Sequence, residues 1–273
     1  MGDEAESCLG FLGAGRMAAA LAGGVIRSGA WGAGRVLATD VSPEALGRFT
    51  AGTGGARVGS PMELVERCGV IVLAVKPGQV ADALAPVAGF AGGRLLVSLA
   101  AGVTLARLEA LVPAGFRVIR VMPNTPALVG AGASAYSLGE RATEADASVA
   151  ERLLGCVGMA VRVPEGQLDA VTGLSGSGPA YLCLVIEALA DGGVAAGLPR
   201  ALAQRLAAQT VLGTGRLVVE TGEHPARLKD EVASPAGTTV EGLKVLEGRG
   251  VRSAFIDAVA AATRRSRELG QGK

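Results

Sequence analysis

A glycine-rich segment near the N-terminus has the residue types and spacing that bind a dinucleotide. It reads GFLGAGRMA over residues 10–18, and from Gly13 it matches the pattern G-x-G-x-x-A between an apolar run and a helix-like segment. Gly13 permits a tight turn, Gly15 lets the backbone approach a pyrophosphate, and Ala18 keeps the helix close to the strand. Backbone N–H groups at the start of the helix would bind the phosphates; the alternative is a packing turn. The candidate cofactor-binding residues here are Gly10, Gly13, Ala14, Gly15, Arg16 and Met17.

Asp40 ends the next strand-like run, 25 residues after Gly15. Its carboxylate could accept hydrogen bonds from an adenosine ribose 2′-OH, and its charge would repel a 2′-phosphate. This favours NADH slightly over NADPH, although Thr39 and Ser42 could still hydrogen-bond a phosphate. The alternative role for Asp40 is to cap the following helix, and the two roles are compatible.

Three further strand tips are expected at the same edge of a sheet, because doubly wound sheets bind ligands beyond the carboxyl ends of their strands. At Ala74, Val75, Lys76 and Pro77 we expect backbone contact with the cofactor, while the Lys76 side chain either meets a phosphate or faces solvent. Small residues at Ala100, Ala101 and Gly102 leave room for a nicotinamide ring. Asn124, between two prolines, either reaches that ring or orders a turn.

A fourth candidate lies in the C-terminal part, where the turn Ser234-Pro235-Ala236 precedes Gly237, Thr238 and Thr239. The N–H groups of the last three residues would be free at the start of a helix, which suits a carboxylate, and the two hydroxyls add donors and acceptors. The alternative is simply a well-capped helix.

The elements that position these residues fall into two parts. Residues 1–163 alternate short β-rich runs with helical segments, and the apolar runs are continuous (VIVLAV at 70–75, LLVSLA at 95–100, FRVIRVM at 116–122). Continuous runs indicate a sheet covered on both faces, so the fold class is α/β with an N-terminal Rossmann-like, doubly wound parallel sheet. Residues 164–273 read as helices, the first long one beginning after SGSGP with Ser as its cap and Pro179 in its first turn.

The second long helix, about residues 199–220, is apolar on more than one face. Such a helix needs more cover than a domain of about 100 residues supplies, so it indicates a partner subunit and an all-α dimerisation domain.

Composition excludes several classes of function. With 26 Lys and Arg against 25 Asp and Glu, and aromatics at 3%, the chain lacks the charge and the stacking surfaces of a nucleic-acid-binding protein. Four widely spaced cysteines and one histidine predict no metal site. The longest uncharged stretch, 121–139, is interrupted by prolines and glycines, so no membrane span is expected. The acidic N-terminus resembles no signal or transit peptide, which predicts a cytoplasmic protein.

Taken together, these segments resemble the pyrroline-5-carboxylate reductase family. The likeness covers essentially the whole chain and rests on GFLGAGRMA, LAVKP, SLAAGVT, RVMPNTP, TGLSGSGPAY, ALADGGVAAGLPR and LKDEVASPAGTTVEGLKVLE, of which the last is the most specific. The C-terminal half looks most like the animal enzymes, whose paralogues divide between mitochondria and cytosol. The resemblance implies interlocked dimers, five of which often form a decamer, with the active site between the cofactor edge of one subunit and the Ser-Pro-Ala-Gly-Thr-Thr loop of its partner.

The implied reaction is NAD(P)H-dependent reduction of the C=N bond of 1-pyrroline-5-carboxylate to L-proline, the last step of proline synthesis. By resemblance, the N–H groups of Thr238 and Thr239 hold the substrate carboxylate, and Ser234 and Gly237 shape the loop. The Thr239 hydroxyl, the catalytic candidate, bonds the ring nitrogen, and Glu165 matches a position near the substrate. No general acid stands out; an imine that binds already protonated needs only positioning and electrostatics.

The chain departs from its relatives at three positions. Ala236 replaces a glycine that is usual in the family, a modest steric change. Glu231 stands where some relatives have an asparagine near the cofactor, and Asp40 replaces the small hydroxyl residue of some animal relatives; both changes disfavour a 2′-phosphate. The alternatives are a reductase of another cyclic imino acid and a non-catalytic dinucleotide-binding redox sensor. A 3-hydroxyacid dehydrogenase is less compatible, because the chain offers no Lys or His base in a matching motif.

Overall fold

The computed structural model describes residues 8–270. By their contacts, the described residues form two compact units, 8–176 with 262–270, and Ser177–Ala261. The division does not test the domain boundary predicted between residues 163 and 164, which stays a prediction.

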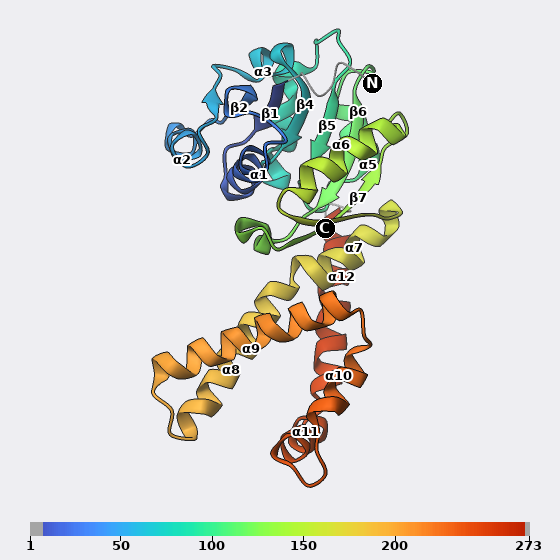
Figure 1. The fold of residues 1–273 in the computed structure, drawn as a ribbon. Coiled ribbons are helices and arrows are strands. Elements are labelled where there is room, and N and C mark those ends of the chain that lie inside the picture. Colours follow the sequence, from blue (N-terminus) through green and yellow to red (C-terminus); the bar gives the residue numbers. More distant parts are fainter. Residues whose placement is uncertain (1–7, 271–273) are drawn as a thin grey trace. The chain divides into compact units, whose positions relative to one another are not determined.

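The first unit is built on one eight-stranded sheet with the strand order β3-β2-β1-β4-β5-β6-β7-β8 (Figure 1). The first six strands in that order are parallel, and they carry the predicted apolar runs. The strands are β1 Cys8–Leu12, β2 Val36–Thr39, β3 Ala56–Arg57, β4 Cys68–Leu73, β5 Leu95–Ser98, β6 Arg117–Met122, β7 Gly132–Leu138 and β8 Gly158–Arg162. The α/β, Rossmann-like prediction is confirmed.

Strand β7 is not predicted by the sequence pattern; it runs antiparallel to β6, so the sheet is not wholly parallel. Its sequence, GASAYSL, has small and polar residues in place of a β-branched run, and it follows a proline-rich tip. This segment is a strand because it pairs with β6 on one side and β8 on the other. Neither pairing can be recognised from the residues of the segment itself.

Helices cover both faces of this sheet, which explains the continuous apolar strands. In β4, Val70 and Val72 pack into one buried cluster with residues of α1 and α6, while Ile71 and Leu73 pack into a second with residues of α3, α4 and α5. The helices are α1 Arg16–Arg27, α2 Pro43–Thr53, α3 Pro61–Arg67, α4 Val80–Leu84, α5 Leu105–Leu111, α6 Glu144–Gly155 and α7 Leu168–Val171. Two faces buried at once require apolar residues at every strand position.

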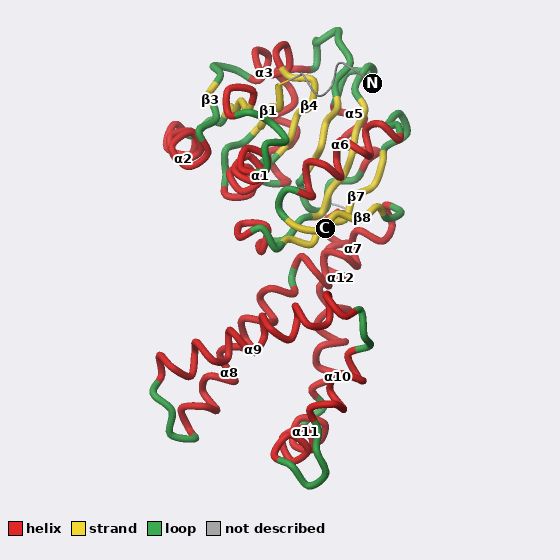
Figure 2. The backbone as a smooth tube through the Cα atoms, viewed as in Figure 1, coloured by secondary structure: helices red, strands yellow, loops and turns green. Residues whose placement is uncertain are grey.

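The second unit is helical (Figure 2). Its helices match the predicted ranges closely: α8 Gly178–Ala195, α9 Arg200–Thr221, α10 Pro225–Val232, α11 Thr238–Gly248 and α12 Val251–Gly270, whose residues 262–270 belong to the first unit. Left-handed glycines end two of these segments, Gly197 (φ +98°) after α8 and Gly222 (φ +66°) after α9. The buried core of the unit is small: Ala190, Ala203 and Ala207 between α8 and α9.

The predicted start of the first long helix is confirmed in position, with Ser177 at the N-cap and Pro179 in the first turn, but the predicted capping by the serine side chain is wrong. A π-helical turn, Thr172–Gly176, joins α7 to α8, and Ser177 makes no side-chain capping hydrogen bond. The hydroxyls of Thr172 and Ser175 instead donate to the carbonyls four residues before them, Leu168 (2.8 Å) and Val171 (3.1 Å). Gly176 packs against Met122, since a Cβ there would lie 2.6 Å from its Cε. Single π turns of this kind occur often at functional sites.

Candidate active site

The glycine-rich loop lies where β1 ends and α1 begins, as predicted. Gly13 has φ +97°, and a Cβ on it would lie 2.8 Å from the carbonyl oxygen of Ala74. No larger residue fits there, because both the backbone conformation and the close approach require glycine. The N–H of Gly13 donates to Thr39 O at 2.9 Å, and that of Ala74 donates to Leu12 O at 2.8 Å. The loop is therefore docked between the tips of β2 and β4.

Gly15 is the N-cap of α1, and a Cβ on it would meet nothing within 4 Å. Arg16 is also exposed and Met17 is half-buried, whereas Ala18 is fully buried against the sheet. The first N–H groups of α1 have no partner within the helix, so the loop has the open space and the donors that a pyrophosphate needs. Gly10 lies deeper, in β1, where a Cβ would lie 2.8 Å from Leu64 Cγ, so its glycine serves packing.

Both carboxylate oxygens of Asp40 accept hydrogen bonds from backbone N–H groups. Oδ2 accepts from the N–H of Ala14 at 2.7 Å, and Oδ1 accepts from the N–H of Ser42 at 2.8 Å. Ser42, and not Asp40, is the N-cap of α2, accepting from Ala45 N. Asp40 therefore links the glycine-rich loop to the β2–α2 turn, and each oxygen keeps a lone pair for a further donor.

The other predicted strand tips lie at the same edge, because β1, β4, β5 and β6 are parallel. The N–H of Leu99 donates to Leu73 O at 2.9 Å, so the tip of β5 is hydrogen-bonded to the tip of β4. Lys76 and Pro77 are exposed, and Ala74 and Val75 are half-buried. At the tip of β5, Ala100 is buried, Ala101 is exposed and Gly102 has φ +75°.

Asn124 orders the structure around it. Its Oδ1 accepts from the N–H of Ala133 at 2.8 Å, and its Nδ2 donates to the carbonyl of Ser175 at 3.1 Å. With 8% of its surface exposed, it ties the tip of β6 to the start of β7 and to the π-helical turn. Of the two roles predicted for Asn124, the structure shows the ordering one.

Glu165 lies in a short 3-10 turn, Glu165–Gln167, after β8. Its Oε1 accepts from the N–H of Leu105 at 2.7 Å and from Arg120 Nη1 at 2.9 Å. Arg120 is 6% exposed on β6, and the sequence analysis missed it. The two arginines inside the run FRVIRVM, Arg117 and Arg120, were the available signal, because a charge in a buried strand needs a partner.

In the second unit, the predicted substrate loop is a tight turn followed by α11. The N–H of Gly237 donates to Ser234 O at 3.0 Å, with Pro235 second and Ala236 (φ +53°) third in the turn. This is the pattern of a type II turn, whose third position favours glycine. Ala236 therefore changes more than local sterics: a Cβ in the left-handed region costs about 1 kcal/mol. Gly237 lets the turn close tightly, since a Cβ there would lie 2.3 Å from Ser234 Oγ and 3.1 Å from Ser234 O, so the serine side chain would have to move.

Gly237 is the N-cap of α11 and offers no side chain to cap it. The N–H groups of Thr238 and Thr239 are in the first turn and have no partner inside the helix. Ser234 and Thr238 are exposed and Thr239 is half-buried. The turn thus presents free donors, the positive end of a helix and two hydroxyls together, which is an arrangement that binds a carboxylate.

Glu231 lies on α10 in an ion-pair series. Arg227 Nε lies 3.3 Å from its Oε1, and Arg227 Nη1 lies 3.1 Å from Glu223 Oε2. All three side chains are exposed, so these pairs stabilise the helix little. The charge of Glu231 is partly offset by Arg227, which weakens the expected repulsion of a 2′-phosphate at this position.

Comparison with known proteins identifies the family of this chain. Residues 165–269 match the family model described as pyrroline-5-carboxylate reductase dimerisation, and residues 8–102 match that described as NADP oxidoreductase, coenzyme F420-dependent. The pyrroline-5-carboxylate reductase 3 of Mus musculus is 43% identical over 262 residues, covering 96% of this chain and 95% of its own. This chain belongs to the pyrroline-5-carboxylate reductase family.

The likeness to this reductase family is not particular to animals. The pyrroline-5-carboxylate reductase of Synechocystis is 55% identical over 202 residues, covering 74% of this chain and 75% of its own. The crystal structure of Plasmodium falciparum pyrroline carboxylate reductase with NADP bound has a TM-score of 0.87 at 32% identity, covering 97% of this chain and 98% of that one. The whole-chain resemblance seen in the sequence is confirmed.

The dimerisation domain of the reductase family accounts for an apolar helix. The stretch Glu165–Ala195 is long and apolar enough, by length and composition, to cross a membrane, so the expectation that no segment could was too strong. Its first residues are the first matched by the dimerisation model. Many of its large side chains are exposed, among them Leu174, Leu182, Leu184 and Leu189. In this family a second subunit is the partner that such a surface requires.

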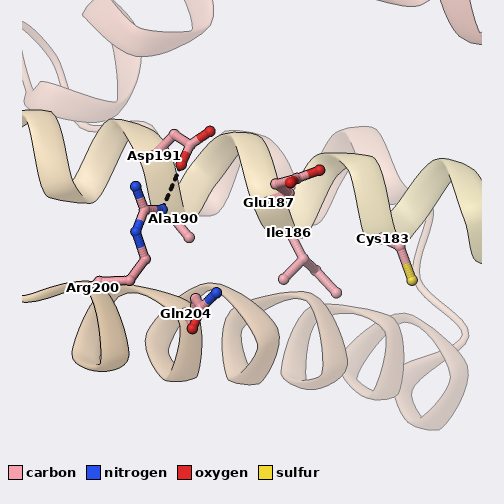
Figure 3. A pocket seen from close by; sticks show the side chains of 7 residues that line it. All are labelled: Cys183, Ile186, Glu187, Ala190, Asp191, Arg200 and Gln204. Carbon is pink, nitrogen blue, oxygen red and sulfur yellow. Dashed lines mark hydrogen bonds and ion pairs between the residues drawn. The ribbon is translucent and has the colours of Figure 1, made fainter.

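Two hollows lie outside the predicted site residues or at their margin. One, of about 450 Å³, lies between α8 and α9 and has the Arg200–Asp191 ion pair at one end and Cys183 at the other (Figure 3). It belongs to the reductase dimerisation domain and contains none of the predicted residues. A second, of about 300 Å³ in the first unit, has Glu165, Ser137 and Arg162 in its wall. Only the second touches a residue that the sequence singled out.

Proposed function

We propose that this chain reduces 1-pyrroline-5-carboxylate to L-proline with a nicotinamide cofactor. The observation that carries the proposal is the amino end of α11, where a type II turn leaves two N–H groups and two threonine hydroxyls unpartnered within the helix. It occurs in the same chain as a dinucleotide loop of the family that the comparisons identify. When bound, the cofactor supplies a hydride from nicotinamide C4 to the imine carbon; with one proton, the products are NAD(P)⁺ and the ring amine.

The roles of the substrate residues follow from that turn. The N–H groups of Thr238 and Thr239 hold the carboxylate, and the helix dipole adds favourable charge. The Thr239 hydroxyl meets the ring nitrogen, while Ser234 and Gly237 keep the turn in shape. Because no dedicated acid lies in the loop, the imine binds in its protonated form, and the loop's contribution to rate is orientation.

The cofactor loop of the first unit fits a dinucleotide, since the approach above Gly15 is open and Gly13 cannot be replaced. We propose a modest preference for NADH. Asp40 supports it, because a carboxylate with free lone pairs suits a ribose 2′-OH and repels a phosphate. The Plasmodium falciparum structure has NADP bound, so a relative of this fold accepts the phosphorylated cofactor, and the proposed preference of this chain depends on the charge of Asp40.

The protein assembles as a homo-oligomer through the dimerisation domain. We propose that the turn before α11 meets the cofactor edge of a partner subunit and that five dimers form a decamer. Exposed apolar side chains throughout the second unit support the dimer: Leu202, Leu206, Leu212, Leu217, Leu246 and Ile256 are at least two-fifths exposed. The decamer and a cytoplasmic location stay predictions.

The test of the function is steady-state reduction of 1-pyrroline-5-carboxylate by purified protein, with NADH and NADPH in parallel. Turnover with a higher kcat/KM for NADH is the expected result. Turnover that favours NADPH keeps the reductase and overturns the role of Asp40. Absence of turnover with either cofactor, where both bind, overturns this substrate. The remaining candidates are then a reductase of another cyclic imino acid, such as a six-membered homologue, and a redox sensor.

A further inference from the structure

A buried arginine on β6 has no part in the function described so far. Arg120 has 6% of its surface exposed, and its register partners are Ser98 on β5 and Ser137 on β7, both almost fully buried. Residues in register point to the same face of a sheet, so a polar row crosses three strands inside an otherwise apolar layer. A charge there is destabilising unless it is paired.

The partner of Arg120 reaches a second element. Arg120 Nη1 donates to Glu165 Oε1 at 2.9 Å, and the same oxygen accepts from the N–H of Leu105 at 2.7 Å. Leu105 is the first residue of α5, where an N–H has no helical partner and a negative charge is favourable. The hydroxyl of Thr104, the N-cap, accepts from Arg107 N at 3.3 Å. The start of α5 is therefore held by its own cap and by a carboxylate 60 residues away.

These contacts confine the loop between β5 and α5, residues 99–104. At its first end, Ser98 Oγ accepts from the N–H of Ala100 at 3.3 Å. In the middle, Gly102 lies against the end of α12, since a Cβ on Gly270 would lie 3.1 Å from Gly102 O. At the end of the loop, the N–H of Leu105 donates to Glu165 Oε1. Ala100, Ala101 and Gly102, which the sequence assigns to the nicotinamide ring, thus lie in a loop held at three points.

We propose that Arg120 is a positioning residue for hydride transfer. Through its ion pair with Glu165, it fixes the start of α5. The start of α5 in turn fixes the position of the 99–104 loop against the nicotinamide ring. The proposal rests on the proposed function, because it needs the ring to lie on this loop. It also gives Glu165 a structural role within its own unit, where one carboxylate oxygen accepts from two donors.

The decisive variant is Arg120→Met, which keeps the bulk of the stem and removes the charge. We expect kcat to fall about tenfold or more, because small misplacements of reacting atoms cost that much in rate. The deuterium isotope effect with 4-deuterated NADH should rise as hydride transfer becomes limiting. The dissociation constant of NADH and the KM for 1-pyrroline-5-carboxylate should stay near those of the unaltered protein, since the phosphates and the carboxylate bind elsewhere.

Arg117→Met is the matched control. Arg117 lies three positions earlier on the same strand, and its Nε lies 2.9 Å from the buried carboxylate of Asp146. Removing it also breaks an ion pair of β6, so it should lower Tm without changing the isotope effect. Glu165→Gln keeps an oxygen for the N–H of Leu105, so its loss of kcat should be smaller than that of Glu165→Leu.

Three results would overturn the proposal. One is Arg120→Met behaving as Arg117→Met, with Tm lowered and both kcat and the isotope effect unchanged. Another is Glu165→Gln raising the KM for 1-pyrroline-5-carboxylate while Arg120→Met is normal, which makes Glu165 a substrate ligand. If the unaltered protein does not turn over this imine, the proposed function fails independently of the role of Arg120. The emission maximum of bound NADH, which reports the surroundings of the nicotinamide ring, then tests the positioning role. A shift in Arg120→Met but not in Arg117→Met supports the positioning role, and no shift in either overturns it.

Discussion

Single polar atoms decide what each part of the proposed site can bind. Asp40 holds two backbone N–H groups, one in the dinucleotide loop and one in the turn before α2, so its charge is held at the edge where a ribose would lie. In the second unit, Gly237 allows the turn to close against Ser234, and the two threonines then offer donors that the helix leaves free. At this scale, the chemistry follows from backbone geometry as much as from side chains.

Thr239→Val tests the residue scale, because valine keeps the shape and removes the hydroxyl. Losing a hydrogen bond to a charged ring nitrogen removes about 1.5–3 kcal/mol of transition-state stabilisation, so kcat/KM should fall about 10- to 100-fold. NADH binding, measured by fluorescence titration, should be unaffected. Thr50→Val in α2 is the control, since that hydroxyl serves only Gly47 of its own helix. An unaltered kcat/KM in Thr239→Val would remove the residue from the mechanism.

Turns and strand pairings set the stability of individual elements. Ala236 occupies a left-handed position that glycine would occupy without cost, and it is the only such non-glycine residue in the described part of the chain. Tyr136 joins β7 to α6, because its hydroxyl donates to Glu151 Oε1 at 2.6 Å. Both features lie inside elements and can be measured without any assay of activity.

Ala236→Gly should raise the free energy of unfolding by about 1 kcal/mol, because it relieves the Cβ in the left-handed region. The measurement is denaturant unfolding at fixed protein concentration. Ala106→Gly, at an exposed position of α5, is the matched control and should lower stability by about 1 kcal/mol at most. Destabilisation by Ala236→Gly would show that the turn adopts another backbone conformation.

Tyr136 predicts a loss of stability at alkaline pH. Burial, followed by the hydrogen bond to Glu151, raises the pKa of this phenol to about 12 from an ordinary value of 10.0. Between those values the unfolded chain releases the proton and the folded chain keeps it, so stability is full below pH 10 and falls as pH rises. The loss reaches about 2–3 kcal/mol.

Urea unfolding between pH 9 and pH 12 measures that slope. Tyr136→Phe should lose the part of this pH dependence that comes from the phenol. Its free energy of unfolding at neutral pH should be lower by about 1 kcal/mol, because the hydrogen bond to Glu151 is lost. Tyr181→Phe is the matched control, since it leaves Tyr136 in place and should keep the slope. Equal slopes in the unaltered protein and in Tyr136→Phe would contradict the raised pKa of the phenol.

At the scale of the whole molecule, the second unit is too poorly buried to stand alone. Its buried core is three alanines, while large apolar side chains remain exposed on α8, α9, α11 and α12. Burying them in a second copy supplies the missing hydrophobic stabilisation, as expected for obligate dimers. The dimerisation domain is therefore part of the folding of the chain as well as of its assembly.

Light scattering during size exclusion should give multiples of the 27.1 kDa subunit, a decamer being ten of them. Leu184→Glu on α8, at a side chain 66% exposed in the isolated chain, should dissociate the assembly and make Tm depend strongly on concentration. Met159→Glu on β8, with 60% exposed, is the control and should leave the assembly intact. If the assembly is unchanged by Leu184→Glu, the subunit interface does not include this face of α8.

The amino-acid sequence by itself determined the features that depend on neighbours in the chain: the glycine turn at Gly13, the buried parallel strands, the ranges of α9 to α12 and the free amino end of α11. Only the tertiary structure decided that β7 is a strand, that α7 continues into α8, that Asp40 holds Ala14, and that Glu165 joins Arg120 to Leu105. The bond of Asp40 to Ala14 and those of Glu165 to Arg120 and Leu105 link residues 26 to 60 positions apart. Local propensity and spacing carry no information about such partners, because burial and hydrogen bonding between distant segments choose them.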